Sequence, residues 1–79
     1  MNNFEIFDEL TREGQFIEAA TFALRCAKGC GSARNHGMWL GYAVNAATQF
    51  SPEMGETVSV ALGNGRWGNI AAAEAALQA

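Results

Sequence analysis

The sequence has little charge, almost no proline and few cysteines, and these shortages exclude several classes of protein. Of 79 residues, only 16% are charged, one is proline and two are cysteine. Composition therefore excludes collagen, extended disorder and a disulfide scaffold. Eight acidic residues against five basic ones give a net charge of −3. This charge argues against direct nucleic-acid binding, because nonspecific binders need cationic surface to displace counterions.

Long apolar runs are also missing. Residues 1–5 lack the basic start and apolar run of a secretory signal, and no stretch holds about 18 uninterrupted apolar residues. We therefore expect a cytosolic protein without membrane contact. In that compartment Cys26 and Cys30 are expected to be reduced thiols.

Apolar residues are plentiful but small. They make up 49% of the chain, and 15 of these 39 residues are alanine, which leaves 22 large side chains and two cysteines for a core. The length predicts one domain over residues 1–79. A domain this short buries only about 60% of the surface that its unfolded chain exposes, so binding a partner or a second copy is a way to bury more.

The apolar spacing predicts an all-α bundle of four to five short helices. The first two are expected over residues 4–13, capped by Asn3, and over residues 16–28, with a tight turn at Gly14 between them. The second helix is expected to be central, because its polar residues fall on a single stripe. That stripe consists of Glu18, Thr21, Arg25 and Lys28.

Three further helices follow. A helix over 33–50 is expected after Ser32, with Gly37 and Gly41 allowing a neighbour close approach, and Ser51-Pro52 starts the next one. Residues 57–62 would alternate equally well as a strand, but we expect a helix because a lone strand has no partner. After a loop over 63–69, Asn69 is expected to cap a helix over 70–78. The predicted core comprises Phe7, Leu10, Phe16, Phe22, Leu24, Trp39, Leu40, Phe50, Leu62 and Leu77.

Residues 63–68 match the dinucleotide fingerprint G-x-G-x-x-G, but the match fails on length. Only 11 residues follow Gly68, so there is no second parallel strand and no acid about 20 residues on to bind a ribose. A turn between two helices is the better interpretation, and we expect no cofactor.

The only cysteines and histidine lie close together in the sequence. Cys26, Cys30 and His36 are too few for a zinc site, which needs four ligands, unless a dimer shares them. A nucleophilic pair of Cys30 and His36 is conceivable near Lys28 and Arg34, but no third group orients it. We therefore expect no enzyme and no bound metal, and Cys26 is expected in the core.

Acidic residues gather near the N-terminus. Residues 1–20 hold five acids and one arginine, and Glu5, Glu9 and Glu13 lie at i, i+4 and i+8 of the first helix, with Asp8 beside them. One interpretation is a solvated face. The other is an acidic docking strip that competes with nucleic-acid phosphates for a basic groove on another protein.

At class level the chain resembles phage-encoded anti-CRISPR proteins, which are short, cytosolic, acidic, single-domain proteins without an enzymatic motif. The resemblance implies occlusion of the nucleic-acid-binding surface of a CRISPR effector complex, with Glu5, Asp8, Glu9 and Glu13 as candidate contacts. One alternative is a helical adaptor that dimerises through apolar faces, for which Tyr42 and Trp67 are candidate exposed contacts. The other is a thiol or metal protein that uses Cys26, Cys30 and His36.

Overall fold

The computed structural model describes residues 1–65 and 67–79, and these residues form five helices and no strand. The helices are α1 (Asn3–Arg12), α2 (Phe16–Lys28), α3 (Ala33–Phe50), α4 (Pro52–Leu62) and α5 (Ile70–Gln78). The predicted all-α bundle is therefore confirmed. Residues 57–62 belong to α4, so the strand alternative is wrong.

Side-chain caps define most helix starts, as the sequence predicts. The hydroxyls of Ser32 and Ser51 accept the N–H groups of Asn35 and Met54, and the Asn69 side chain accepts that of Ala72. Each cap satisfies a backbone donor that has no partner within its helix.

The first helix begins one residue earlier than predicted. Asn2, not Asn3, is the cap, and its side-chain oxygen accepts the N–H of Glu5 at 2.9 Å. The Glu5 carboxylate accepts the N–H of Asn2 at 3.4 Å, which completes a capping box. Gly14 then makes the turn to α2 with a positive φ of 76°, a conformation that glycine adopts without steric cost.

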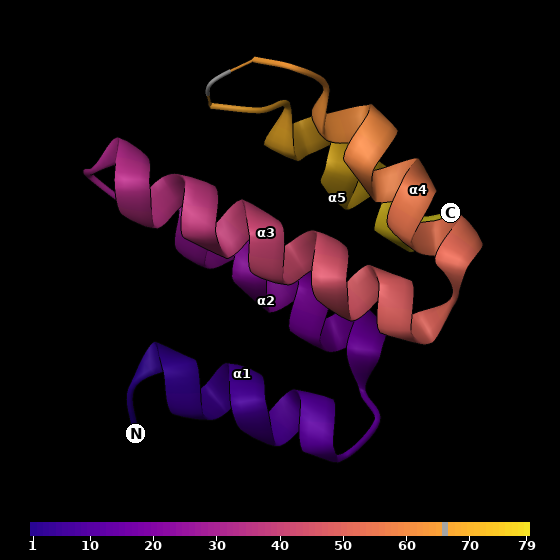
Figure 1. Cartoon of the computed structure of the whole chain (residues 1–79). Helices are drawn as coiled ribbons and strands as arrows, with labels where there is room; N and C mark the ends of the chain where they lie inside the picture. The colour runs from indigo at the N-terminus through magenta and orange to yellow at the C-terminus, as the bar shows by residue number, and fades with distance from the viewer. Residues whose placement is uncertain (66) are drawn as a thin grey trace.

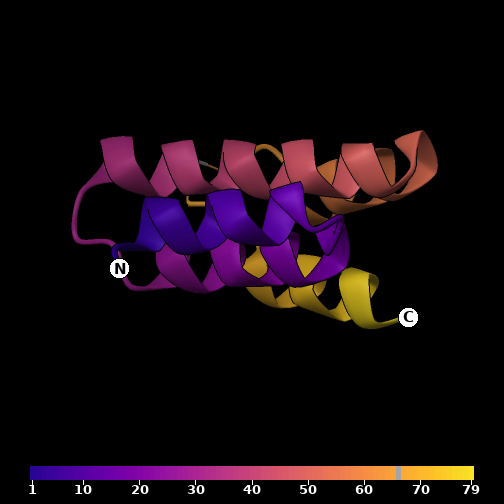
Figure 2. The ribbon, with the colours of Figure 1, turned by 90° about the horizontal axis from the view of Figure 1, so that it is seen from below.

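The helices are arranged around the pair formed by α2 and α3. In Figure 1, α1 lies on one side of this pair, and α4 and α5 lie on the other. Figure 2 shows the same arrangement from below, with α1 alongside α2 and α3. Because α2 contacts α1, α3 and α5, it is central, as its single polar stripe predicts.

The core is built largely of alanine. Leu24, Trp39, Leu62 and Leu77 are buried as predicted, together with Val58 and eight alanines. Five other predicted core residues, namely Phe7, Leu10, Phe16, Phe22 and Leu40, are only half-buried. Phe50 is 55% exposed, so its assignment to the core is wrong: it is the last residue of α3, beyond the part that its neighbours cover.

The predicted close approach at Gly37 and Gly41 is also wrong. Both glycines are exposed, and a Cβ on either would meet nothing within 4 Å. The close approach occurs at Gly55 on α4, where a Cβ would lie 2.0 Å from Thr48 Oγ1 and 2.8 Å from Thr48 Cα. Only glycine lets α4 come this near to α3.

Candidate functional site

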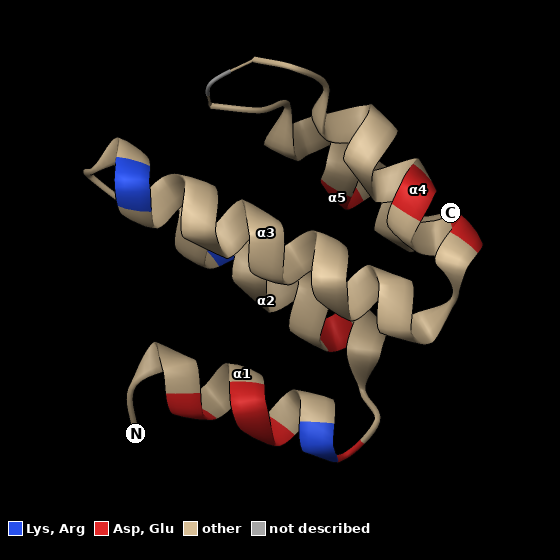
Figure 3. Cartoon of the chain, viewed as in Figure 1, with Lys and Arg blue, Asp and Glu red and all other residues tan. Residues whose placement is uncertain are grey.

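Three acidic residues of α1 and Glu13, its C-cap, are exposed; the helix ends at Arg12, one residue before the predicted end. We call Glu5, Asp8, Glu9 and Glu13 the acidic strip; all four are exposed, as the sequence predicts. Figure 3 shows red acidic segments along the ribbon of α1 and just after its end. Glu5 is partly engaged in the capping box. Within the described residues, the carboxylates of the other three have no ion-pair partner, so they remain available to cations of another molecule.

The opposite face of α1 is held by aromatic contacts. Phe4 stacks on Trp39 with ring centroids 5.1 Å apart, and Phe7 stacks on Tyr42 at 5.3 Å. Trp39 and Tyr42 meet edge to face at 5.3 Å. No residue of α1 is fully buried, so this cluster is a main anchor of α1 to α3. Tyr42 is half-buried in it rather than exposed, which leaves Tyr42 little surface for a partner.

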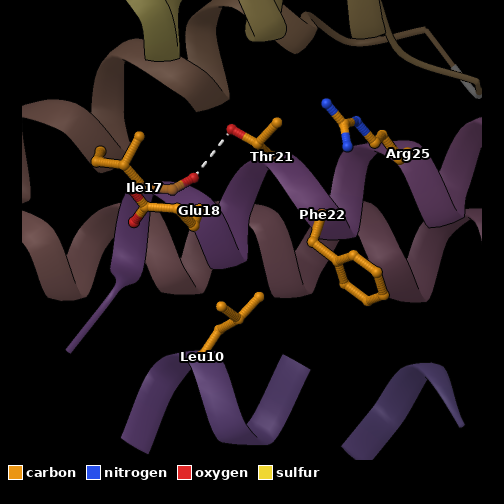
Figure 4. Close-up of a pocket in the computed structure, with 6 residues that line it drawn as sticks. All are labelled: Leu10, Ile17, Glu18, Thr21, Phe22 and Arg25. Carbon is orange, nitrogen blue, oxygen red and sulfur yellow. Dashed lines mark hydrogen bonds between the residues drawn. The ribbon is translucent and has the colours of Figure 1, made fainter. Parts of the chain in front are cut away.

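A groove of about 340 Å³ lies between α1 and α2. Its apolar lining comes from Leu10 of α1 and from Ile17 and Phe22 of α2, and Leu10 points toward α2 in Figure 4. Glu18 and Arg25, both exposed, stand seven residues apart along the groove, which corresponds to about 10 Å along a helix. The groove therefore offers apolar surface between two opposite charges.

This groove includes three of the four residues of the polar stripe that the sequence places on α2, all but Lys28. Thr21, in the middle of the stripe, donates its hydroxyl to the Ile17 carbonyl at 2.9 Å. The sequence predicts the stripe but not its combination with Leu10. That combination depends on the angle between α1 and α2, which the turn at Gly14 determines. Helical periodicity in the sequence does not predict this angle.

The two cysteines and the histidine lie in different environments. Cys26 and Cys30 are free and half-buried, and burial, with a smaller contribution from Cys30, raises the pKa of the Cys26 thiol. A thiol with a raised pKa is a poorer nucleophile and metal ligand near neutral pH, because the thiolate is the reactive form. No group of three or more His, Cys, Asp or Glu residues that could hold a metal occurs in the described part of the chain.

His36 is buried, with 5% of its surface exposed, and both ring nitrogens face backbone carbonyls. Nδ1 lies 2.8 Å from the oxygen of Ala27, and Nε2 lies within hydrogen-bond distance of the oxygen of Trp67. From the sequence, His36 is a candidate metal ligand or nucleophile, and this structural role is not predicted. His36 lies three residues before Trp39 and therefore on the same buried face of α3. This spacing is the sequence signal that could have predicted its burial.

The glycine-rich segment connects α4 to α5, as predicted. Gly63 and Gly68 have positive φ values of 73° and 70°, and the Asn69 side chain is occupied as the cap of α5. Trp67 is 49% exposed, and its ring meets the His36 ring edge to face at 4.8 Å. Arg66, part of the fingerprint match, lies outside the described residues.

Comparisons with known proteins do not assign this chain to a family. No protein-family model, curated protein or solved structure matches this chain. Within the described residues, no helix is long and apolar enough to cross a membrane. The acidic strip and the groove between α1 and α2 are the two surface features described above that could contact another molecule.

Proposed function

We propose that this protein acts by binding another protein, with the acidic strip of α1 as the main contact. The observation that carries the proposal is the set of exposed carboxylates on α1 and at its C-cap, three of them without an ion-pair partner in the described chain. Like charges at i, i+4 destabilise an isolated helix by a few tenths of a kcal/mol each. A cationic partner would neutralise this repulsion, and its binding would be strengthened by attraction to the same carboxylates.

The groove between α1 and α2 adds apolar contact beside this charge. Leu10, Ile17 and Phe22 offer apolar area at the groove, while the acids steer a basic surface toward it. Charges at the rim of an interface mainly speed association, whereas apolar contacts at its centre slow dissociation. Strip and groove together therefore suit a partner that carries basic residues around an apolar projection.

The partner class that fits best is a nucleic-acid-binding protein, because its basic groove normally receives phosphates. Together with the resemblance to anti-CRISPR proteins, this leads us to propose a phage-type inhibitor that occludes the nucleic-acid-binding surface of a CRISPR effector complex. No catalytic step is part of this function. It requires only that α1 reach the basic groove before nucleic acid does.

A competition assay tests this proposal. Purified CRISPR effector complexes of several types would be incubated with the protein and then with fluorescently labelled target DNA. We expect at least one effector to lose DNA binding, and the variant Glu9→Lys/Glu13→Lys to be a weaker inhibitor. The matched control is Glu53→Lys/Glu56→Lys, which changes the charge equally on exposed positions of α4. Undiminished DNA binding by every effector would contradict the inhibitor proposal.

A second candidate is a homodimeric adaptor, which large exposed apolar residues favour. Phe50 is 55% exposed, Val60 74% and Trp67 49%. Light scattering during gel filtration would test it: the adaptor function predicts a dimer that Val60→Ser or Trp67→Ser dissolves and that charge reversal on α1 leaves intact. A monomer at all concentrations would contradict it.

A further inference from the structure

The groove between α1 and α2 presents charges of opposite sign in a fixed order along one helix. Glu18 lies in the first turn of α2 and Arg25 in its last turn, and both are exposed residues of the groove lining. They are seven positions apart, or about two helical turns, so both side chains project from nearly the same side of α2. Within the described residues neither takes part in an ion pair, so each can pair with a charge on another molecule.

The centre of the groove is apolar. In Figure 4, Leu10 points toward α2 and Phe22 toward α1, and Ile17 completes the apolar lining. All three side chains are half-buried, so part of each remains in contact with solvent. The Thr21 hydroxyl donates its proton to the Ile17 carbonyl. A partner must therefore cover apolar surface at the centre and supply opposite charges at the two ends.

The walls of the groove favour a helix over an extended peptide. Leu10, Thr21 and Phe22 lie within helices, whose backbone groups bond to one another, and the Leu10 carbonyl accepts the N–H of Gln15 at 2.9 Å. An extended segment laid on these walls would lose the hydration of its own backbone groups without finding partners for them. A helix satisfies its backbone internally and brings only side chains to the surface.

The same lining does not suit a small molecule. Small-molecule sites bury most of the ligand and direct a few polar groups to its surface from close range. Here the two charged side chains are exposed and about 10 Å apart along α2. Two side chains that are seven positions apart on a second helix match this separation.

The charges also determine the direction of a docked helix. Acidic residues stabilise the first turn of a helix and basic residues its last turn, because of the macrodipole. A helix antiparallel to α2 places its basic last turn beside Glu18 and its acidic first turn beside Arg25, so both ends meet an opposite charge. The end of α1 that leads into α2 carries Glu9, Arg12 and Glu13, a net negative charge that also attracts the basic end.

We propose that the groove receives an amphipathic helix of the partner protein, antiparallel to α2. This helix carries an acidic residue opposite Arg25, apolar residues three and four positions later against Leu10 and Phe22, and a basic residue seven positions later opposite Glu18. The inference rests on the proposed binding function and specifies the element that the partner contributes. The acidic strip attracts a basic surface, and the groove distinguishes one helix from others by the order of its charges.

Synthetic helical peptides test the order of charges. The matched peptide is alanine-rich, with a glutamate, leucines three and four positions later, and an arginine seven positions later; the control peptide has arginine in place of the glutamate. Each is titrated into ¹⁵N-labelled protein, and affinity is taken from the amide shifts of Thr21 and Phe22. We expect the matched peptide to bind about fivefold more tightly, because the control replaces one exposed ion pair with a repulsion. The control carries more positive charge, so general attraction to an acidic protein predicts the opposite order.

The variant Arg25→Glu should reverse this preference. It places a carboxylate at both ends of the groove, so the peptide with two arginines should now bind about fivefold more tightly than the matched peptide. Arg25 is exposed, and circular dichroism checks that the variant keeps its helices. If it fails to fold, the preference of the unmodified protein still decides.

A spin label at the N-terminus of the matched peptide tests the direction. We expect it to broaden the amide signal of Arg25 more than that of Ile17. The reverse pattern would overturn the antiparallel arrangement. Equal affinity for the two peptides, or shifts confined to another face of the protein, would overturn the proposal. So would concentration-dependent shifts at Thr21 and Phe22 without peptide, since a second copy would then cover the groove.

Failure of this inference is distinguishable from failure of the proposed function. If an effector loses DNA binding in the competition assay but the peptides are bound equally, the helix in the groove is overturned and the inhibitor proposal stands. If the protein prefers the matched peptide but inhibits no effector, the inhibitor proposal is contradicted and the assignment of the groove to a helix is supported.

Discussion

Replacing Gly55 with alanine should push α4 away from α3, whereas the same change at Gly41 should stabilise the protein. At Gly55 the new Cβ would lie 2.0 Å from Thr48 Oγ1, 2.8 Å from Thr48 Cα and 2.9 Å from Thr48 Cβ. The Thr48 side chain cannot relieve the contact by rotating, because its backbone Cα is among the atoms met. One of the two helices must therefore move.

The magnitude follows from two opposing effects. Overpacking a close contact costs typically 1–3 kcal/mol, and a backbone clash places Gly55→Ala near ~3 kcal/mol. Alanine in a helix interior returns about 1 kcal/mol relative to glycine. The net loss is about 2 kcal/mol, and a domain of this size loses roughly 4–8 °C of melting temperature per kcal/mol. We therefore expect a decrease of about 8–16 °C.

The Gly41→Ala variant is the matched control. Gly41 lies within α3, is exposed, and has nothing within 4 Å of its added Cβ, so only the helix-propensity gain of about 1 kcal/mol remains. Thermal unfolding followed by circular dichroism should show a rise of roughly 4–8 °C. If both variants shift the melting temperature in the same direction, the packing of α4 on α3 described here is incorrect.

Three further substitutions test the account of stability. Ser51→Ala removes the hydroxyl that accepts the Met54 N–H at 3.0 Å and should cost about 1 kcal/mol in chemical denaturation; no loss would show that this cap is dispensable. Lys28→Gln breaks the exposed pair with Glu74 and should change stability by less than about 1 kcal/mol, so a larger loss would show that the pair is shielded from water. Phe7→Ala removes two aromatic contacts of α1; hydrogen exchange should then speed up in α1 with little change in α2, and equal acceleration of both helices would contradict the anchoring role of the cluster.

The sequence predicts most helix boundaries here because their start signals are local. Ser32, Ser51 and Asn69 each precede an apolar period, and each caps its helix in the structure. The error at Asn3 has an equally local cause. Only Asn2 has a glutamate three residues on, at Glu5, so the capping-box spacing distinguishes two adjacent asparagines that composition treats alike.

Tertiary contacts are less well predicted because periodicity identifies a face but not what covers it. Phe50 shares a face with Trp39 yet lies beyond the covered length of α3, and Gly41 lies on a side where nothing approaches. The exposure of the acidic strip follows from its spacing alone. The groove beside Leu10 and the buried environment of His36 depend on how the helices and loops pack against one another. The spacing of residues in the sequence does not predict this packing.

Binding by the acidic strip is the central claim, and an association-rate measurement tests it most directly. The protein and its Glu9→Lys/Glu13→Lys variant would be titrated against the effector whose DNA binding is blocked, at low and at physiological salt. We predict that the variant associates at least about tenfold more slowly at low salt, with a smaller difference at higher salt, because exposed charges steer encounter and are screened. Folding should be unchanged or slightly more stable. Equal association rates for the two proteins at both salt concentrations would contradict the claim.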